Sequence, residues 1–297
     1  MPRTVCVFGA AGWTGRAVVQ ELLSHGGEMT TVRAFDLSAG AWDGWEDLDG
    51  PAPAAAELRF GDITDFETVH AAIAGCDAVI HTTVATTGDT PTSSANLYAA
   101  SREEDATWMV NMKGLCERPA APPCPRSQLR LCTRAGNVLE AARLEGCSQV
   151  VHIGSCHSVW PSAPHTGHSE PGEIFMDVNA RRPDGGLYAV QKRLQEEMCR
   201  QFHDAHGLPV TVFRPDYIID TRLGLGRHRE DLRGQEASKG WVCRHEIALA
   251  CRLAVEKKVG FEILHVVNNT AGQAELCNVG RTESLLGMRF DSAVARL

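Results

Sequence analysis

The sequence predicts an α/β fold, a doubly wound parallel sheet in which strands alternate with helices along the chain. Short unbroken runs of apolar residues recur, and such runs are typical of strands buried on both faces of a parallel sheet. Segments with apolar residues three and four positions apart separate these runs, which is the spacing of amphipathic helices. Strands and helices in this alternation form βαβ units, and such units place the helices on the two faces of one sheet.

The first strand and the first helix have the clearest patterns. The apolar run at 5–8 predicts the strand, and a helix over 14–24 follows because Val18, Val19 and Leu22 share one face. Gly26 can end that helix. Further strands are expected at 31–35, 58–60, 78–82, 149–153, 210–213 and 261–266, and further helices at 65–74, 103–113, 135–145, 187–205 and 245–257.

Composition and charge exclude several classes of protein. The 297 residues are 43% hydrophobic and 22% charged, which is enough to bury a core and excludes a disordered chain. A net charge of −8 gives no electrostatic reason to expect a nucleic acid or an anionic membrane as a partner, and no apolar run approaches the ~20 residues of a membrane span. The 11 cysteines and 12 histidines show no clustered ligand spacing, so we expect no metal, reduced thiols and a cytoplasmic protein.

A glycine-rich turn lies between the first strand and the first helix. A tight turn and the close approach of a phosphate both require residues without a Cβ, and the first amides of the helix then face the phosphates. The spacing is Gly-x-x-Gly-x-x-Gly. This context predicts a dinucleotide cofactor bound by Gly9, Ala11, Gly12, Trp13, Thr14 and Gly15.

Acidic residues follow the second and third strands. Asp36 comes 21 residues after Gly15, where a carboxylate accepts hydrogen bonds from the adenosine ribose. It repels a 2′-phosphate, which favours NAD over NADP, although Arg33 nearby could bind that phosphate. Asp62 and Ile63 can reach the adenine. Alternatively, Asp62 or Thr64 caps the helix expected over 65–74.

Tyr188 and Lys192 lie four residues apart in the helix expected over 187–205, so they share one face. A phenol has a pKa of ~10 in unstructured peptides, which is too high for a base at neutral pH. A lysine ammonium and a positively charged nicotinamide stabilise the phenolate, so Tyr188 can take up or return a hydroxyl proton. The pair is weak evidence by itself, and its weight depends on the glycine turn.

In combination, these motifs resemble the extended short-chain dehydrogenase/reductase family, the NAD-dependent epimerase/dehydratase group. The resemblance runs from residue 4 to about 215 and rests on the glycine turn, Asp36, Gly61-Asp62, Asn111, Tyr188, Lys192 and Arg214-Pro215. It implies a Rossmann-type NAD(P)-binding domain over 1–215 and a small C-terminal substrate lobe, including late Rossmann elements, over 216–297. It also implies hydride transfer through a bound nicotinamide, a proton relay shaped by Asn111, and a homodimer formed through the Tyr188 helix.

The family has a hydroxyl-polarising serine or threonine after the strand at 149–153. Counting forward from that strand selects Ser155, whereas counting back from Val159-Trp160 selects Cys156, whose thiol is a weak hydrogen-bond donor. Ser155 is preferred over Cys156 and Ser158, because a hydroxyl performs the polarisation. His157 is a candidate substrate contact or a solvent-facing loop residue.

The substrate is expected to be small, because only 105 residues follow Lys192. Ser155-Cys156-His157 resembles the uronate dehydrogenase branch of the family, which indicates a sugar or sugar acid. The segments around Asp36 and His81 also resemble the 3β-hydroxysteroid dehydrogenase branch, and a non-catalytic NAD(P)-binding redox sensor is a further alternative. The fourth strand is expected to end at Thr82, and Thr82 and Thr83 are expected to bind the cofactor. The loop that follows either overhangs the substrate, with Thr83, Thr86 and Thr87 available to sugar hydroxyls, or is solvated.

The segment 115–134 does not fit the family pattern. The helix carrying Asn111 should run almost directly into the one that carries Asn137, yet 22 residues separate Gly114 from Asn137. This stretch contains four prolines and cannot form a helix, because proline lacks the amide donor. We expect an insertion looped out from the helix, or translated intervening sequence.

Overall fold

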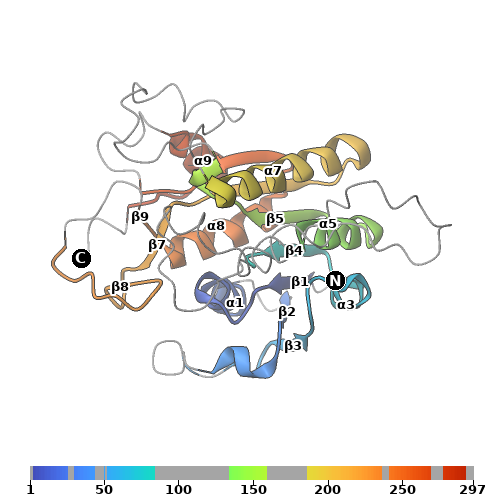
Figure 1. The fold of residues 1–297 in the computed structure, drawn as a ribbon, viewed down its shortest axis with the longest axis horizontal. Helices are drawn as coiled ribbons and strands as arrows, with labels where there is room; N and C mark the ends of the chain where they lie inside the picture. Colours follow the sequence, from blue (N-terminus) through green and yellow to red (C-terminus); the bar gives the residue numbers. More distant parts are fainter. Residues whose placement is uncertain are drawn as a thin grey trace.

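A seven-stranded parallel sheet forms the centre of the molecule (Figure 1). The computed structural model describes residues 3–25, 30–43, 50, 52–83, 134–158, 186–235, 241–268 and 277–291. The strand order is β10-β6-β5-β4-β1-β2-β3, and every pairing in it is parallel. The strands are β1 (Arg3–Phe8), β2 (Thr30–Asp36), β3 (Glu57–Phe60), β4 (Ala78–His81), β5 (Gln149–Ile153), β6 (Val210–Arg214) and β10 (Glu262–His265).

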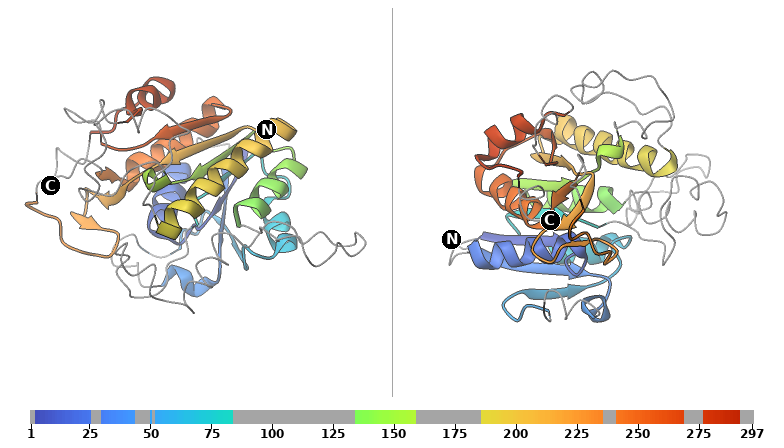
Figure 2. Two further views of the ribbon diagram at one scale, coloured as in Figure 1. Left: turned by 45° about the horizontal axis from the view of Figure 1, so that its top comes forward. Right: turned by 90° about the vertical axis from the view of Figure 1, so that its left-hand side faces the viewer.

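Helices cover both faces of the sheet (Figure 2). On one face α1 (Trp13–His25) packs against α8 (Arg244–Lys257), and α9 (Val279–Leu286) packs against α8 and β10. On the other face lie α3 (Phe66–Ile73), α5 (Arg134–Leu144) and α7 (Gly186–His206). Two short 3₁₀ helices, η1 (Ala39–Trp42) and η3 (Cys156–Ser158), lie in the connections.

Two apolar cores flank the sheet because successive side chains of a strand point to opposite faces. In β1, Val5 and Val7 enter the core beneath α1 and α8, whereas Cys6 and Phe8 enter the core beneath α3 and α5. Both faces of the central strands are therefore apolar. This is why the strands appear in the sequence as unbroken apolar runs rather than as alternating ones.

A second sheet follows the sixth strand of the main sheet. Its order is β8-β7-β9, formed by β7 (Tyr217–Asp220), β8 (Leu225–Gly226) and β9 (Trp241–Cys243). The chain then returns to the main layers, because α8 begins directly after β9 and packs against α1. The part of the chain after residue 216 thus contributes both a small sheet and the last elements of the large one.

The predicted fold class is confirmed, and every strand expected from the sequence is present. The helix expected over 103–113 lies outside the described residues. The small sheet and α9 were not predicted. Two of the strands of that sheet, β8 and β9, contain only two and three residues, too few to show a periodic pattern.

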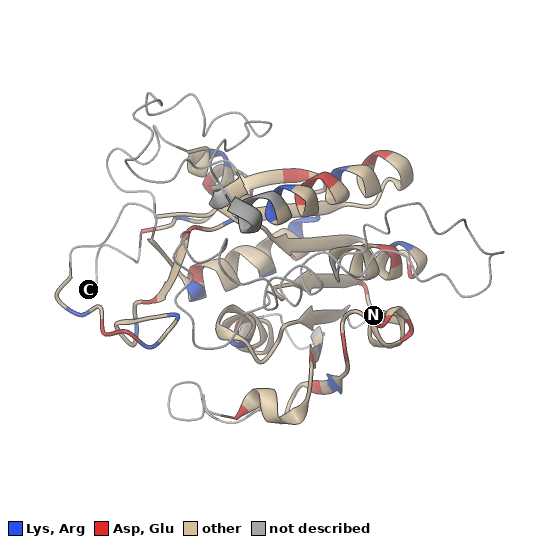
Figure 3. Ribbon diagram, in the orientation of Figure 1, with Lys and Arg blue, Asp and Glu red and all other residues tan. Residues whose placement is uncertain are grey.

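Charge is mixed on the surface elements. Acidic and basic residues are interspersed along α7, for example (Figure 3). Among the described residues, no helix is long and apolar enough to span a lipid bilayer. The same part of the chain contains no cluster of three side chains suited to hold a metal ion.

We expect Gly15→Ala to destabilise the fold by about 3 kcal/mol, the upper range for overpacking a rigid site. A Cβ on Gly15 would overlap the carbonyl oxygen of Gly9 and lie 2.9 Å from the Cα of Ala10, and neither backbone atom can move without shifting β1. Urea denaturation measures the free energy of unfolding.

Gly280→Ala is the matched control. It makes the same substitution in a helix, α9, where a Cβ would meet nothing within 4 Å. It should leave the protein as stable or more stable by up to about 1 kcal/mol. Equal effects of the two substitutions would contradict the close contact at Gly15.

Candidate active site

The glycine turn packs tightly against the end of β4. Gly9 has φ +75°, and its amide donates to the carbonyl of Phe35 at 3.0 Å. A Cβ on Gly9 would lie 2.9 Å from Thr82 Oγ1 and 3.0 Å from the backbone nitrogen of Thr83. The Thr82 hydroxyl donates to the carbonyl of Phe8 at 2.8 Å. Gly9, Thr82 and Thr83, predicted separately from the sequence, therefore lie together at the carboxyl edge of the sheet.

Helix α1 begins at this turn. Gly12 donates its amide to the carbonyl of Gly9 at 3.1 Å, and α1 starts at the next residue, Trp13. The first amides of a helix have no acceptor within it, so those of Trp13, Thr14 and Gly15 form the kind of anion-binding end that accepts a pyrophosphate. The backbone contacts at Gly9 and Gly15 form a cradle that a Cβ would fill, which fits a dinucleotide.

Asp36 ends β2 beside the same turn. Its carboxylate accepts hydrogen bonds from the amides of Ala11 and Leu37, each at 2.8 Å. Backbone donors thus fix the side chain within reach of a ligand on the turn. The position suits the ribose contact that the sequence predicts.

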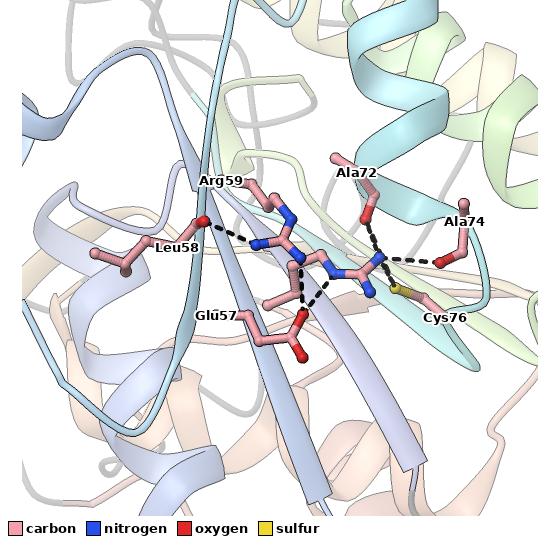
Figure 4. A network of polar contacts seen from close by, with 7 residues as sticks. Glu57, Leu58, Arg59, Ala72, Ala74 and Cys76 are labelled. Carbon is pink, nitrogen blue, oxygen red and sulfur yellow. Dashed lines mark hydrogen bonds and ion pairs between the residues drawn. The ribbon is translucent and has the colours of Figure 1, made fainter.

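Arg33 points away from this edge. Its guanidinium donates to the carbonyls of Ala72 at 2.7 Å and Ala74 at 3.0 Å, and it pairs with Glu57 at 3.2 Å (Figure 4). These acceptors lie at the C-terminus of α3 and at the start of β3. Arg33 therefore serves the amino edge of the sheet, and no pattern in the sequence indicated these partners.

The loop after β3 is fastened by a side chain of α5. Asn137 Nδ2 donates to the carbonyl of Ile63 at 3.0 Å, and Asp62 accepts from the amide of Thr64 at 2.8 Å. The expectation that Asp62 or Thr64 caps the following helix is wrong. Asp65 is the N-cap, because its carboxylate accepts from the amide of Glu67 at 3.1 Å and the α3 helix starts one residue later.

Lys192 lies on the buried face of α7, and its side chain points to the end of β5. Its ammonium donates to the carbonyl of Ile153 at 3.0 Å, and the residue is only 1% exposed. Burial lowers the pKa of Lys192 to about 8, against the opposing effect of the Glu196 carboxylate. An amine with this pKa changes its charge close to physiological pH.

Glu196 and Arg214 form a buried ion pair behind Lys192. Two bonds join them, at 2.8 Å and 2.6 Å, and the hydroxyl of Ser158 donates to the same carboxylate at 2.7 Å. The pair joins α7, β6 and η3, so it fixes the turn that follows β5. Sequence reasoning missed Glu196, although its place four residues after Lys192 puts it on the same helix face.

The three candidates for the polarising group have different surroundings. The Cys156 thiol is fully buried and donates to the carbonyl of Arg214 at 3.1 Å, and burial raises its pKa. Ser158 binds Glu196 and the carbonyl of Ser155. These contacts commit Cys156 and Ser158 to the packing of η3. Ser155 is buried as well, at 3% exposed, so its role as the polarising group stays a prediction from its hydroxyl.

The side chains of five predicted site residues lie outside the described part of the structure. Tyr188 lies in the first turn of α7, one turn before Lys192, but its side chain is outside the described residues, as is that of His157 in η3. Asn111, Thr86 and Thr87 lie entirely outside the described residues. So does the predicted insertion, up to residue 133. Their roles stay predictions.

Trp13 fastens the glycine turn to the small sheet, a role not foreseen from the sequence. Its indole Nε1 donates to the carbonyl of Ile218 at 3.1 Å. The guanidinium of Arg244 lies 4.1 Å from the centre of the Trp13 ring and pairs with Asp220 at 2.6 Å. The C-terminal elements are thus held directly against the glycine turn and the start of α1.

A buried histidine pair lies beside Lys192. His81 of β4 and His152 of β5 are joined through their Nδ1 atoms at 3.0 Å. Burial and the charge of Lys192 lower the pKa of His152 to about 3, so its imidazole is neutral at physiological pH. The only signal in the sequence is the presence of two histidines near strand ends, and this does not predict their contact.

Comparison with known families agrees with this geometry. The sequence profile of the family described as NAD(P)H-binding matches residues 9–258, most of the chain. The chain belongs to this NAD(P)H-binding family. The predicted nicotinamide cofactor class is thereby confirmed. No curated protein is significantly similar to the sequence.

Several solved structures share the fold of this NAD(P)H-binding protein. The uronate dehydrogenase from Agrobacterium tumefaciens has a TM-score of 0.63 at 20% identity, over 97% of this chain and 85% of that one. The glucuronic acid dehydrogenase from Chromohalobacter salexigens has 0.62 at 20%, over 99% and 86%. The UDP-glucose 4-epimerase from Thermus thermophilus, in complex with NAD, has 0.57 at 18%, over 97% and 85%. These likenesses confirm the Rossmann-type fold that the resemblance to extended short-chain dehydrogenases implies.

The lowered pKa of Lys192 predicts how stability depends on pH. Between the folded pKa of about 8 and the ordinary value of 10.5, the unfolded chain holds a proton on Lys192 that the folded chain does not. Stability therefore rises with pH across this window. Relative to Lys192→Met, the wild-type protein should gain about 3 kcal/mol between pH 8 and pH 10.5.

Urea denaturation of both proteins at pH 7 to 10.5 measures this difference, and subtraction removes the titration of other groups. Below pH 8 the difference should be flat, because the lysine is charged in both states. If the difference in stability between the two proteins falls as the pH rises, or does not change, the pKa of Lys192 is not lowered in the folded protein.

Proposed function

We propose that this protein is an NAD-dependent oxidoreductase or epimerase that acts on a hydroxyl-bearing carbon of a sugar or sugar acid, with Tyr188 as acid and base. The observation that carries the proposal is the buried Lys192, held at 3.0 Å from the carbonyl of Ile153 at the edge where the glycine turn lies. Tyr188 precedes it by one turn of α7. A bound nicotinamide would supply the hydride acceptor or donor.

The residues of the chain would move one proton. Tyr188 Oη would take the hydroxyl proton of the substrate, or return it, and the Lys192 ammonium would favour the phenolate by its charge. The Ser155 hydroxyl would donate a hydrogen bond to the substrate oxygen. Asn111 would contribute to the proton relay.

The geometry around the turn supports NAD as the preferred cofactor. The Asp36 carboxylate, which accepts from the amide of Ala11 in the glycine turn, would repel a 2′-phosphate on the ribose, and Arg33 is bound at the C-terminus of α3. Arg16, the arginine nearest the turn on α1, is fully buried. It donates to the carbonyls of Ala11 and Trp42, and the Trp42 ring lies 4.8 Å from its guanidinium. Neither guanidinium is placed to neutralise the phosphate.

The sugar substrate class rests on the neighbours in fold, which are named as uronate dehydrogenases and nucleotide-sugar epimerases. Thr86, Cys156 and His157 stay candidate substrate contacts, and the burial of Cys156 favours the other two. Dimerisation through α7 also stays a prediction.

Tyr188→Phe tests the chemistry. The variant should bind NADH as the wild type does but lose at least 100-fold in kcat, since general acid–base catalysis contributes about 10²–10⁴-fold. The assay is NADH formation with a panel of sugars, sugar acids and hydroxysteroids. Tyr217→Phe on β7 is the matched control and should keep full activity. Turnover of a hydroxysteroid alone would support the steroid dehydrogenase alternative, and cofactor binding without turnover of any compound would support the sensor.

Asp36→Ser tests the cofactor choice. Removing a charged hydrogen-bond acceptor should weaken NAD binding by at least about tenfold, and NADP binding should strengthen because the repulsion is lost. Fluorescence titration gives both Kd values. An unchanged NAD/NADP ratio would refute the assignment of Asp36 to the ribose.

A further inference from the structure

The first residue of α1 and the first residue of α8 bind each other beside the glycine turn. Arg244 Nη1 donates to the carbonyl of Trp13 at 3.2 Å, and the Arg244 guanidinium lies 4.1 Å from the centre of the Trp13 ring. The Trp13 indole donates in turn to the carbonyl of Ile218 in β7 at 3.1 Å. C-terminal elements therefore hold Trp13 through its backbone and its side chain alike.

A buried carboxylate fixes the same guanidinium. Asp220, at the end of β7, accepts from Arg244 Nε at 2.6 Å and is joined to His245 Nε2 at 3.0 Å. It also accepts from the amides of Arg222 and Leu223, at 2.8 Å and 3.1 Å, in the turn that follows β7. Asp220 is completely buried, and Arg244 is 1% exposed. A planar guanidinium that is paired, hydrogen-bonded and stacked at once can occupy only one place.

The packing of α1 against α8 does not require this arrangement. The two helices share an apolar core that includes Val18 and Ile247, and Arg252 of α8 also pairs with Glu21 of α1 at 2.8 Å. A buried ion pair adds little net stability, because both charges lose their contact with water. The contacts of Arg244 therefore add little to the packing and instead give the start of α1 one fixed position.

The start of α1 is also the end of the helix that faces the cofactor. The hydrogen bond from the amide of Arg16 to the carbonyl of Gly12, at 3.0 Å, closes the first turn, so Trp13 contributes its amide to the anion-binding end of the helix. A displacement of Trp13 would move the amides of this turn with it. Such amides stabilise a phosphate only within hydrogen-bond distance, so a small displacement weakens the contact.

We propose that Arg244 is a positioning residue for the dinucleotide cofactor and that it acts through Trp13. It holds the first turn of α1 where that turn meets the pyrophosphate, so the affinity for the cofactor depends on the C-terminal elements. The coupling is reciprocal, so a bound cofactor also stabilises the attachment of the small sheet. This inference rests on the cofactor class of the family and is independent of the chemistry proposed for Tyr188.

The first experiment compares two probes. ADP-ribose carries the pyrophosphate of the cofactor, whereas adenosine carries only the base and the ribose. Arg244→Met should weaken ADP-ribose binding at least about fivefold, the lower end of the usual coupling between sites, and leave adenosine binding within about twofold. Arg252→Met is the matched control, because Arg252 also joins α8 to α1, and it should leave both affinities unchanged. Calorimetric titration gives the Kd of each probe.

A double-mutant cycle tests the route through Trp13. Trp13→Leu removes the ring next to the guanidinium and the donor to Ile218. The variant that combines Trp13→Leu and Arg244→Met should lose less ADP-ribose affinity than the product of the two single losses, because residues in contact do not act independently. Single losses that simply multiply would refute the route through Trp13.

Hydrogen exchange of the wild-type protein decides the matter even if Arg244→Met does not fold. Saturating ADP-ribose should slow the exchange of peptides that cover β7 and the turn after it, because Asp220 and Ile218 are coupled to the glycine turn. Peptides that cover the C-terminal turn of α5 should exchange at an unchanged rate, since α5 lies on the other face of the sheet.

Three further results would overturn the proposal while the cofactor class stands. One is an equal loss of ADP-ribose and adenosine binding in Arg244→Met. Another is the same loss of ADP-ribose binding in Arg252→Met, and the third is unchanged exchange of the β7 peptides under ADP-ribose. If the wild-type protein does not bind ADP-ribose, the cofactor assignment fails and this inference fails with it. A failed assay of turnover with ADP-ribose binding intact counts only against the proposed function.

Discussion

The contact between the backbones of Gly9 and Gly15 determines the geometry of the glycine turn at the carboxyl edge of the sheet. The carbonyl of Gly9 lies where a side chain on Gly15 would be, so the first turn of α1 packs against the turn that follows β1. The amides of Gly9 and Ala10 bind the carbonyl of Phe35 at 3.0 Å and 3.1 Å, which joins the turn to β2. The Thr82 hydroxyl joins it to β4. Three strands thus converge on one turn, and the places of Asp36 and Thr82 follow from it.

The inner face of α7 imposes the second constraint. This face carries Lys192, Gln195 and Glu196, each at most 2% exposed, where a helix packed on a sheet usually places apolar side chains. A buried charge is costly unless it is paired. The carbonyl of Ile153 accepts a hydrogen bond from Lys192, and Arg214 pairs with Glu196. Both contacts form only when the helix has one particular orientation about its axis. The polar contacts therefore fix the register of α7 against β5 and β6 more strictly than apolar packing would.

Local patterns predicted the elements of the fold because their causes are local. The apolar runs and the glycine spacing are properties of a few consecutive residues. The partners of side chains are not local, and sequence reasoning missed them. Arg244 reaches the carbonyl of Trp13 across 231 positions, and Arg33 reaches Ala72 across 39.

Position within a short turn was equally hard to predict. The choice between Ser155 and Cys156 depended on the direction of counting, because no pattern in the sequence distinguishes Ser155 from the residues of η3 that follow it. The cap at Asp65 was missed for a similar reason, since Asp62 and Thr64 have side chains of the same capping type. Only the three-dimensional contacts of each side chain separate such alternatives.

The spacing of Arg33 and Asp36 explains how β2 serves two different sites. They are three residues apart, an odd number, so their side chains leave the strand on opposite faces. Arg33 enters the face of α3 and α5, where it contacts Cys76, whereas Asp36 leaves on the face of α1 and binds the amide of Ala11. A guanidinium on the far face would have to cross the strand to meet a phosphate beside Asp36. The ribose site that the sequence predicts therefore has the Asp36 carboxylate beside it and not the Arg33 guanidinium, which instead donates to Cys76 and to the carbonyl of Ala72 at the other edge of the sheet.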